Sequence, residues 1–178
     1  MRPWNVLATA LEGRRAALLA ALRPLGAFGG GGYRNVLVGL VPDTAAFLER
    51  VRDALAADRL LPTALARIVP VELHVEFDPA DPGAALAAAA EPLLDRLGAG
   101  TFYVRVERRG LKGIVDSAAL ERDLGTRLWR ALEGRGRTPR VSFRDPDHVL
   151  VVETLGRHAG LALLSRALRA QYPFVRVP

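Results

Sequence analysis

The chain has 178 residues, of which 50% are apolar, contains no cysteine and carries a formal net charge of +6. This length suits one large domain or two small ones, with enough apolar residues for a hydrophobic core. The lack of cysteine excludes disulfides, thiolate metal sites and cysteine nucleophiles, and no apolar run reaches the roughly 18 residues that a membrane span needs.

The charge is unevenly distributed along the chain. Residues 1–100 hold ten Lys and Arg against eleven Asp and Glu, whereas residues 101–178 hold fifteen against eight. A basic half joined to a neutral half indicates a polyanion-binding module with a neutral companion domain. The N-terminal residues lead directly into a predicted strand rather than a signal peptide. We therefore expect a cytoplasmic location.

Strands and helices are predicted to alternate along the first half. We expect a strand over residues 4–10, a helix over 12–22, and a strand over 33–41. The glycine run 29–32 lies between a helix and a strand and lacks the Lys-Ser/Thr ending of a Walker loop. We interpret this run as a flexible connection.

Two further helices and a strand complete the first hundred residues. The helix that begins near 42–44 has the apolar stripe Phe47, Leu48, Val51 and Leu55. A third strand is expected over 68–77, bent at Pro70. Asp81 and Pro82 then begin a helix that Pro92 is predicted to kink or split.

Residues 101–113 form a predicted strand that runs into a basic turn. Phe102, Val104 and Val106 alternate with polar residues, which is the period of a half-buried strand. Arg108, Arg109 and Lys112 then lie on or beside a turn bounded by Gly110 and Gly113. This arrangement can hold a phosphate backbone, and a solvated strand end is the alternative.

The last part of the chain is expected to add one long helix and several strands. Asp116 or Ser117 caps a helix with the predicted core stripe Leu120, Leu124, Leu128 and Ala131. Strands are expected over 141–143 and, as a central strand, over 148–155. For residues 161–170 we favour a strand followed by a short helix over a single helix. The predicted fold class is therefore α+β, with helices packed on mixed sheets.

Seven basic residues are candidates for RNA binding because they follow the basic strand or line the next loop. They are predicted to form or border one basic surface: Arg105, Arg108, Arg109, Lys112, Arg137, Arg140 and Arg144. Trp129 falls on the side of its helix that carries Arg122, away from the apolar stripe. It either packs against a neighbouring element or anchors a partner protein, because tryptophan is enriched at interface hot spots.

Catalytic equipment is sparse in this sequence. The three histidines show no metal-ligand spacing, and we expect no metal site and no cofactor. Glu72, His74 and Glu76 share one face of a predicted strand, where they form either a carboxylate–imidazole cluster or a solvated face. The sequence Gly110-Leu-Lys-Gly113 matches the loop of KH domains, but that loop joins two helices and this one follows a strand.

Four segments together resemble a THUMP domain. They are 101–110, the helix start at Asp116-Ser117 with Asp123-Leu124-Gly125, 141–147 and 149–153. The Phe47 helix and residues 68–72 are similar to the N-terminal ferredoxin-like domain that accompanies THUMP. The resemblance implies a ferredoxin-like domain over residues 1–77 and a THUMP domain over 78–178.

The resemblance also implies a function. THUMP domains bind tRNA at the acceptor stem and the 3′ CCA end, and most of them accompany a thiouridine synthase, methyltransferase, pseudouridine synthase or deaminase domain. No motif of a methyltransferase or thiolation enzyme occurs in this sequence, which is short for an added enzyme domain. It is similar to the stand-alone THUMP adaptors of the tRNA cytidine acetyltransferase.

We therefore expect a non-catalytic adaptor that binds tRNA and presents it to a separate modifying enzyme, with no membrane partner. Two alternatives remain open. One is a tRNA-modifying enzyme with an unrecognised active site, and the other is a THUMP-like module that has lost RNA binding.

Overall fold

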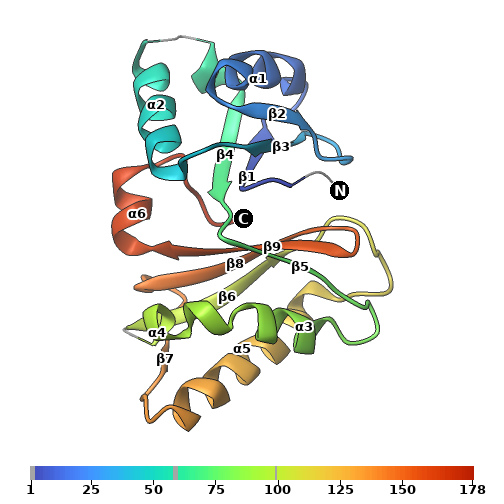
Figure 1. The fold of residues 1–178 in the computed structure, drawn as a ribbon, viewed down its shortest axis with the longest axis vertical. Helices are drawn as coiled ribbons and strands as arrows, with labels where there is room; N and C mark the ends of the chain where they lie inside the picture. The colour runs from blue at the N-terminus through green and yellow to red at the C-terminus, as the bar shows by residue number, and fades with distance from the viewer. Residues whose placement is uncertain (1–2, 58–59, 99) are drawn as a thin grey trace. The chain divides into compact units, whose positions relative to one another are not determined.

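A computed structural model describes residues 3–57, 60–98 and 100–178 (Figure 1). These residues form two compact units. Unit 1 extends to Val71 and includes Arg169–Arg176, whereas unit 2 consists of Glu72–Leu168 and Val177–Pro178. The sequence-based boundary after residue 77 is slightly later and does not include the C-terminal return. No helix in the described ranges is both long and apolar enough to cross a membrane.

Unit 1 contains a four-stranded antiparallel sheet with the order β2-β3-β1-β4. Its elements are β1 (Val6–Ala10), α1 (Arg15–Leu22), η1 (Arg23–Leu25), β2 (Ala27–Gly30), β3 (Val36–Leu40), α2 (Thr44–Ala57), η2 (Leu61–Thr63) and β4 (Leu65–Pro70). The βαββαβ connectivity is ferredoxin-like, in agreement with the predicted fold class. In α2, Phe47, Leu48 and Val51 are buried, as the apolar stripe predicts.

The first two glycines of the run 29–32 belong to strand β2, so the interpretation as a flexible connection is wrong for them. Gly29 and Gly30 pair with Val38 and Leu37 of β3. A Cβ atom on Gly39 of β3 would collide with the ring of Phe28. Because Gly39 has no side chain, the Phe28 ring of β2 can lie against the backbone of β3. The residues of β2 show no apolar alternation, so the sequence pattern does not reveal this strand.

The single strand predicted over 68–77 is two strands in two different sheets. β4 ends at Pro70, and β5 (Leu73–Glu76) pairs with β9 (His158–Ser165) in the sheet of unit 2. The expected bend at Pro70 is thus a complete break. Proline has no N–H group to donate to a continuing ladder.

Unit 2 contains a five-stranded mixed sheet with the order β5-β9-β8-β6-β7. Besides β5 and β9, this unit contains α3 (Pro82–Ala89), η3 (Glu91–Leu93), α4 (Leu94–Leu97), β6 (Thr101–Glu107), α5 (Ser117–Gly134), β7 (Arg140–Val141) and β8 (His148–Leu155). β6 runs parallel to β7 and β8. Helices α3, α4 and α5 cover one face of this sheet (Figure 1). The predicted packing of helices on a mixed sheet is confirmed.

Several local predictions for unit 2 are confirmed. Asp81 and Asp116 cap α3 and α5 by accepting the N–H groups of Ala84 at 3.3 Å and Ala119 at 2.6 Å. The helix is split around Pro92, and β8 is the central strand. A short helix, α6 (Arg166–Gln171), follows β9, as favoured over one long helix.

The buried stripe of α5 differs from the prediction at one position. Leu120, Leu124 and Leu128 are buried as expected, but the fourth fully buried residue is Leu132. Ala131 packs only partly against the core.

Candidate RNA-binding groove

The basic turn after β6 is fastened to the end of β8. The N–H of Arg109 donates to Thr154 Oγ1 at 3.1 Å, and Arg109 O accepts from Gly156 N–H at 2.9 Å. The guanidinium of Arg109 also pairs with the fully buried carboxylate of Glu153, which leaves the Arg109 side chain 11% exposed. Arg109 is therefore committed to holding the turn, which corrects its expected role as a phosphate contact.

The other predicted cations differ in how freely they can meet a ligand. Arg108 is half-buried and donates to Gly110 O. Arg105 donates to Pro178 O at 3.0 Å and lies 3.5 Å from a Glu121 carboxylate oxygen. Four predicted cations are exposed and form no ion pair within the described parts of the chain: Lys112, Arg137, Arg140 and Arg144.

The predicted cations fall into two groups rather than one surface. β6 pairs with β7 at its first two residues, so Arg140 lies opposite Thr101. Lys112 follows the other end of β6. Arg137, Arg140 and Arg144 thus belong to the segment at the start of the strand, and Arg108 and Lys112 belong to its end. The sequence did not predict this separation because it depends on the register of β6 and β7.

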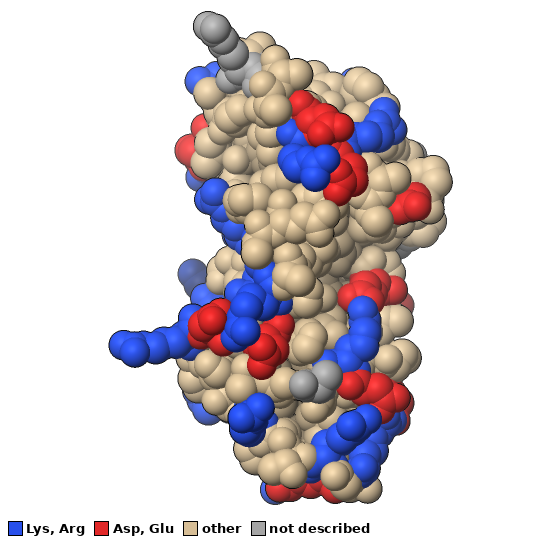
Figure 2. Space-filling model, turned by 90° about the vertical axis from the view of Figure 1, so that its left-hand side faces the viewer, with Lys and Arg blue, Asp and Glu red and all other residues tan. Residues whose placement is uncertain are grey.

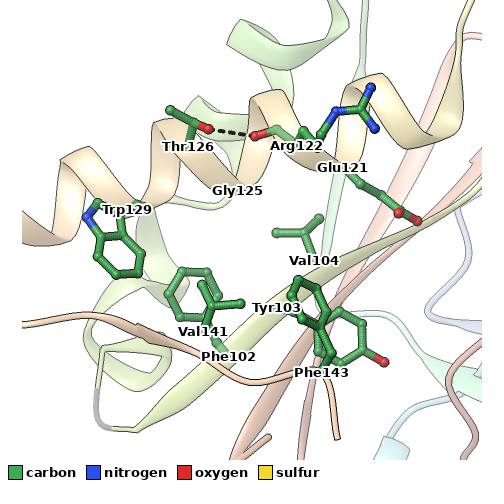
Figure 3. A pocket seen from close by; sticks show the side chains of 10 residues that line it. All are labelled: Phe102, Tyr103, Val104, Glu121, Arg122, Gly125, Thr126, Trp129, Val141 and Phe143. Atoms are coloured by element: carbon green, nitrogen blue, oxygen red, sulfur yellow. Dashed lines mark hydrogen bonds between the residues drawn. The ribbon is translucent and has the colours of Figure 1, made fainter.

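A groove of about 410 Å³ lies between α5, β6 and the segment 141–143 (Figure 3). The N–H of Ser142 donates to Phe102 O at 3.2 Å and holds this segment beside β6. The lining residues come from all three elements: Phe102, Tyr103, Val104, Glu121, Arg122, Gly125, Thr126, Trp129, Val141 and Phe143.

Three aromatic rings are accessible in the groove. The rings of Tyr103 and Phe143 lie 5.5 Å apart at an angle of 45°. Phe143 is 78% exposed, and Trp129 is half-buried on the α5 side. Trp129 therefore faces a groove instead of being buried within the core of unit 2; its proposed role as a partner anchor stays a prediction. Tyr103 and Phe143 were missed as functional candidates, although Phe143 lies between Arg140 and Arg144.

The charged groups in the groove wall favour an anionic ligand. Arg122 is exposed and has no ion pair within the described residues. Glu121, the only acid among the lining residues, accepts from Val106 N–H at 2.8 Å and lies near Arg105. The carboxylate is thus already satisfied, and Arg122 contributes an uncompensated positive charge. Arg122 was not among the predicted binding residues.

Elsewhere in unit 2 many basic residues are neutralised. Arg96 pairs with Glu72, and Arg135 pairs with Glu91 and, at 3.2 Å, with Asp95. Figure 2 shows blue Lys and Arg groups beside red Asp and Glu groups on one face of the molecule. The positive charge available to a ligand therefore comes from the cations that form no ion pair within the described residues.

In the candidate cluster, His74 and Glu76 lie on the edge strand β5, and Glu72 comes directly before it. Glu72 is already engaged, because it pairs with Arg96 and accepts from Leu163 N–H at 3.1 Å. Partial burial lowers the pKa of His74. His74 and Glu76 nevertheless keep more than a third of their surface accessible to solvent, which agrees with the solvated-face alternative.

Comparison with known proteins finds similarity in structure but not in sequence families. No family model matches the chain, and no curated protein matches it. TrmN from Thermus thermophilus superposes with a TM-score of 0.61 at 24% identity, over 89% of this chain and 44% of TrmN. PH1313 from Pyrococcus horikoshii Ot3 gives 0.58 at 12% identity, over 89% of this chain and 53% of PH1313.

A third similar structure is a 4-thiouridine synthetase in complex with RNA and ATP. Its TM-score is 0.55 at 16% identity, over 91% of this chain and 41% of the synthetase. The chain thus spans about half the length of these proteins or less. At these identities the likeness establishes the fold alone, which is THUMP-like.

Proposed function

We propose that the chain is a non-catalytic tRNA-binding adaptor that presents the acceptor stem and 3′ CCA end to a separate tRNA-modifying enzyme. The observation that carries the proposal is a set of three cations, Arg122, Arg140 and Arg144, which form no ion pair within the described residues. Arg122 lines an aromatic groove, and Arg140 and Arg144 are sequence neighbours of its lining residues Val141 and Phe143. Cations without internal partners supply the phosphate contacts on which RNA affinity depends. Aromatic rings add a surface for unpaired bases.

The fold supports the same proposal. A protein with a similar fold is a 4-thiouridine synthetase whose structure contains RNA. The present chain spans 41% of that protein's length. Cytidine acetylation as the chemistry of the modifying enzyme rests on analogy with stand-alone THUMP adaptors.

The test is purification of the tagged full chain from its native cell, with identification of the RNA and protein that accompany it. Enrichment of tRNA together with one modifying enzyme supports the adaptor. Purified chain that modifies tRNA unaided would instead identify an enzyme. Absence of salt-sensitive tRNA binding would identify a module without RNA function.

A further inference from the structure

We propose that the groove between α5, β6 and residues 141–143 stacks unpaired RNA bases on the rings of Tyr103, Trp129 and Phe143. This inference deepens the RNA-binding function proposed above and rests on it. It assigns a ligand class, unpaired nucleotides, to three rings that are not fully buried in the core of unit 2.

The exposure of the groove's outer wall is the first argument. Phe143 is 78% exposed and Val141 is 47% exposed, and a single residue separates them in the sequence. Removing such apolar side chains from water is favourable, so neighbouring exposed apolar residues mark a binding surface. The Tyr103–Phe143 ring pair, with centroids 5.5 Å apart, supplies aromatic faces at this wall.

The floor of the groove is the second argument. Gly125 lies in the interior of α5, where glycine is destabilising relative to alanine. Core packing does not explain this choice, because a Cβ atom there would meet only Val104 Cγ2, at 3.9 Å. The missing side chain instead keeps the groove open between Glu121 and Trp129, which both line it (Figure 3).

The charges identify the occupant as a polyanion rather than an apolar peptide. Arg122 lines the groove on α5 with its guanidinium directed away from the rings (Figure 3), and Arg140 and Arg144 flank the exposed segment 141–143. All three form no ion pair in the described ranges. Rings interleaved with arginines are the arrangement that binds single-stranded nucleic acid, since every base has a face for stacking. Bases within an RNA duplex are already stacked and cannot enter, so the ligand is unpaired.

The experiment compares affinities of the full chain for tRNA, for a single-stranded RNA oligonucleotide, and for an abasic RNA of the same length. The abasic strand keeps the phosphates but removes the bases. Three substitutions at one exposed position separate ring stacking from general apolar contact: Phe143→Tyr keeps a ring, whereas Phe143→Leu and Phe143→Ala do not. Leu40→Ala, at a 44% exposed apolar position of unit 1, is the matched control.

We expect Phe143→Tyr and Leu40→Ala to retain wild-type affinity for the base-bearing strand. Phe143→Leu and Phe143→Ala should weaken it about 5- to 150-fold, the range for loss of one stacked base. Affinity for the abasic strand should not change between variants. Base-bearing RNA should also quench the fluorescence of Trp129; Trp4, the other tryptophan, is 3% exposed and cannot stack.

Equal affinity of the wild type for base-bearing and abasic strands, or wild-type affinity in Phe143→Leu, would overturn the stacking inference while leaving tRNA binding intact. The same holds if Phe143→Ala keeps RNA affinity but loses a co-purifying protein, which would assign the groove to a protein partner. A wild-type chain that binds no tRNA would instead refute the proposed function, and the inference with it.

Discussion

Three hydrogen bonds join Thr101 and Asp147. Thr101 is the first residue of β6, and Asp147 comes directly before β8, the parallel neighbour of β6. Asp147 Oδ2 accepts from the N–H and the hydroxyl of Thr101, both at 2.8 Å, and Thr101 Oγ1 accepts from Asp147 N–H at 3.0 Å. A Cβ atom on Gly100 would lie 2.6 Å from Asp147 Oδ2, so glycine permits this approach. The pair fixes where β6 and β8 begin and thereby anchors one end of segment 140–147.

The first prediction concerns the pH dependence of this link. Hydrogen bonds from the Thr101 N–H and hydroxyl lower the pKa of Asp147. The stabilisation is therefore complete above the unfolded-state pKa of about 3.9 and is lost as the pH falls through the lower folded-state value. Asp147→Asn should reduce the free energy of unfolding at neutral pH, and its difference from wild type should shrink below about pH 4. Urea unfolding over a pH series measures this; a difference independent of pH would contradict it.

The second prediction concerns Arg109. Breaking a buried ion pair costs about 3–5 kcal/mol, so Arg109→Ala should lower the free energy of unfolding by that order. Lys112→Ala, on the same turn but exposed, should leave stability unchanged. Thermal unfolding of both variants is the measurement. An unchanged melting temperature for Arg109→Ala would show that the pair does not hold the turn.

The third prediction concerns which part of tRNA is bound. An acceptor-stem minihelix with an unpaired 3′ end should compete with whole tRNA, because it keeps both the duplex phosphates and the unpaired bases. A blunt duplex of the same stem should compete poorly, since its bases are inaccessible. Competition measured by fluorescence anisotropy decides this. Equal competition by the two RNAs would indicate binding of phosphates alone.

The sequence predicted the elements of unit 2 better than the surface they form. Alternation in β6, the caps Asp81 and Asp116 and the break at Pro92 depend on neighbours in the sequence, and the structure confirms them. The partner of Arg109 could not be predicted, because Glu153 is 44 residues away and its burial follows from the pairing of β6 with β8.

The groove illustrates the same distinction. Trp129 stood out because it lies away from the apolar stripe, but nothing local connects it with Phe143 or Tyr103. Their meeting depends on β7 pairing with the first two residues of β6. Gly29 and Gly30 were misread for a related reason: their strand is defined by pairing with β3 and the ring of Phe28, not by an apolar pattern.

The most direct test of tRNA binding through the unpaired arginines is the salt dependence of tRNA affinity. The full chain is compared with a triple variant, Arg137→Ala, Arg140→Ala and Arg144→Ala. A control triple variant loses the same number of positive charges, but from arginines that are already paired with carboxylates. Its substitutions are Arg96→Ala, Arg127→Ala and Arg135→Ala.

Each lost phosphate contact reduces the slope of log affinity against log salt concentration by about 0.9. The account predicts that the slope of the first triple variant is shallower than wild type by roughly 2 to 3, and that the control stays close to wild type. A first triple variant with the wild-type slope, or a control that loses as much, would contradict it.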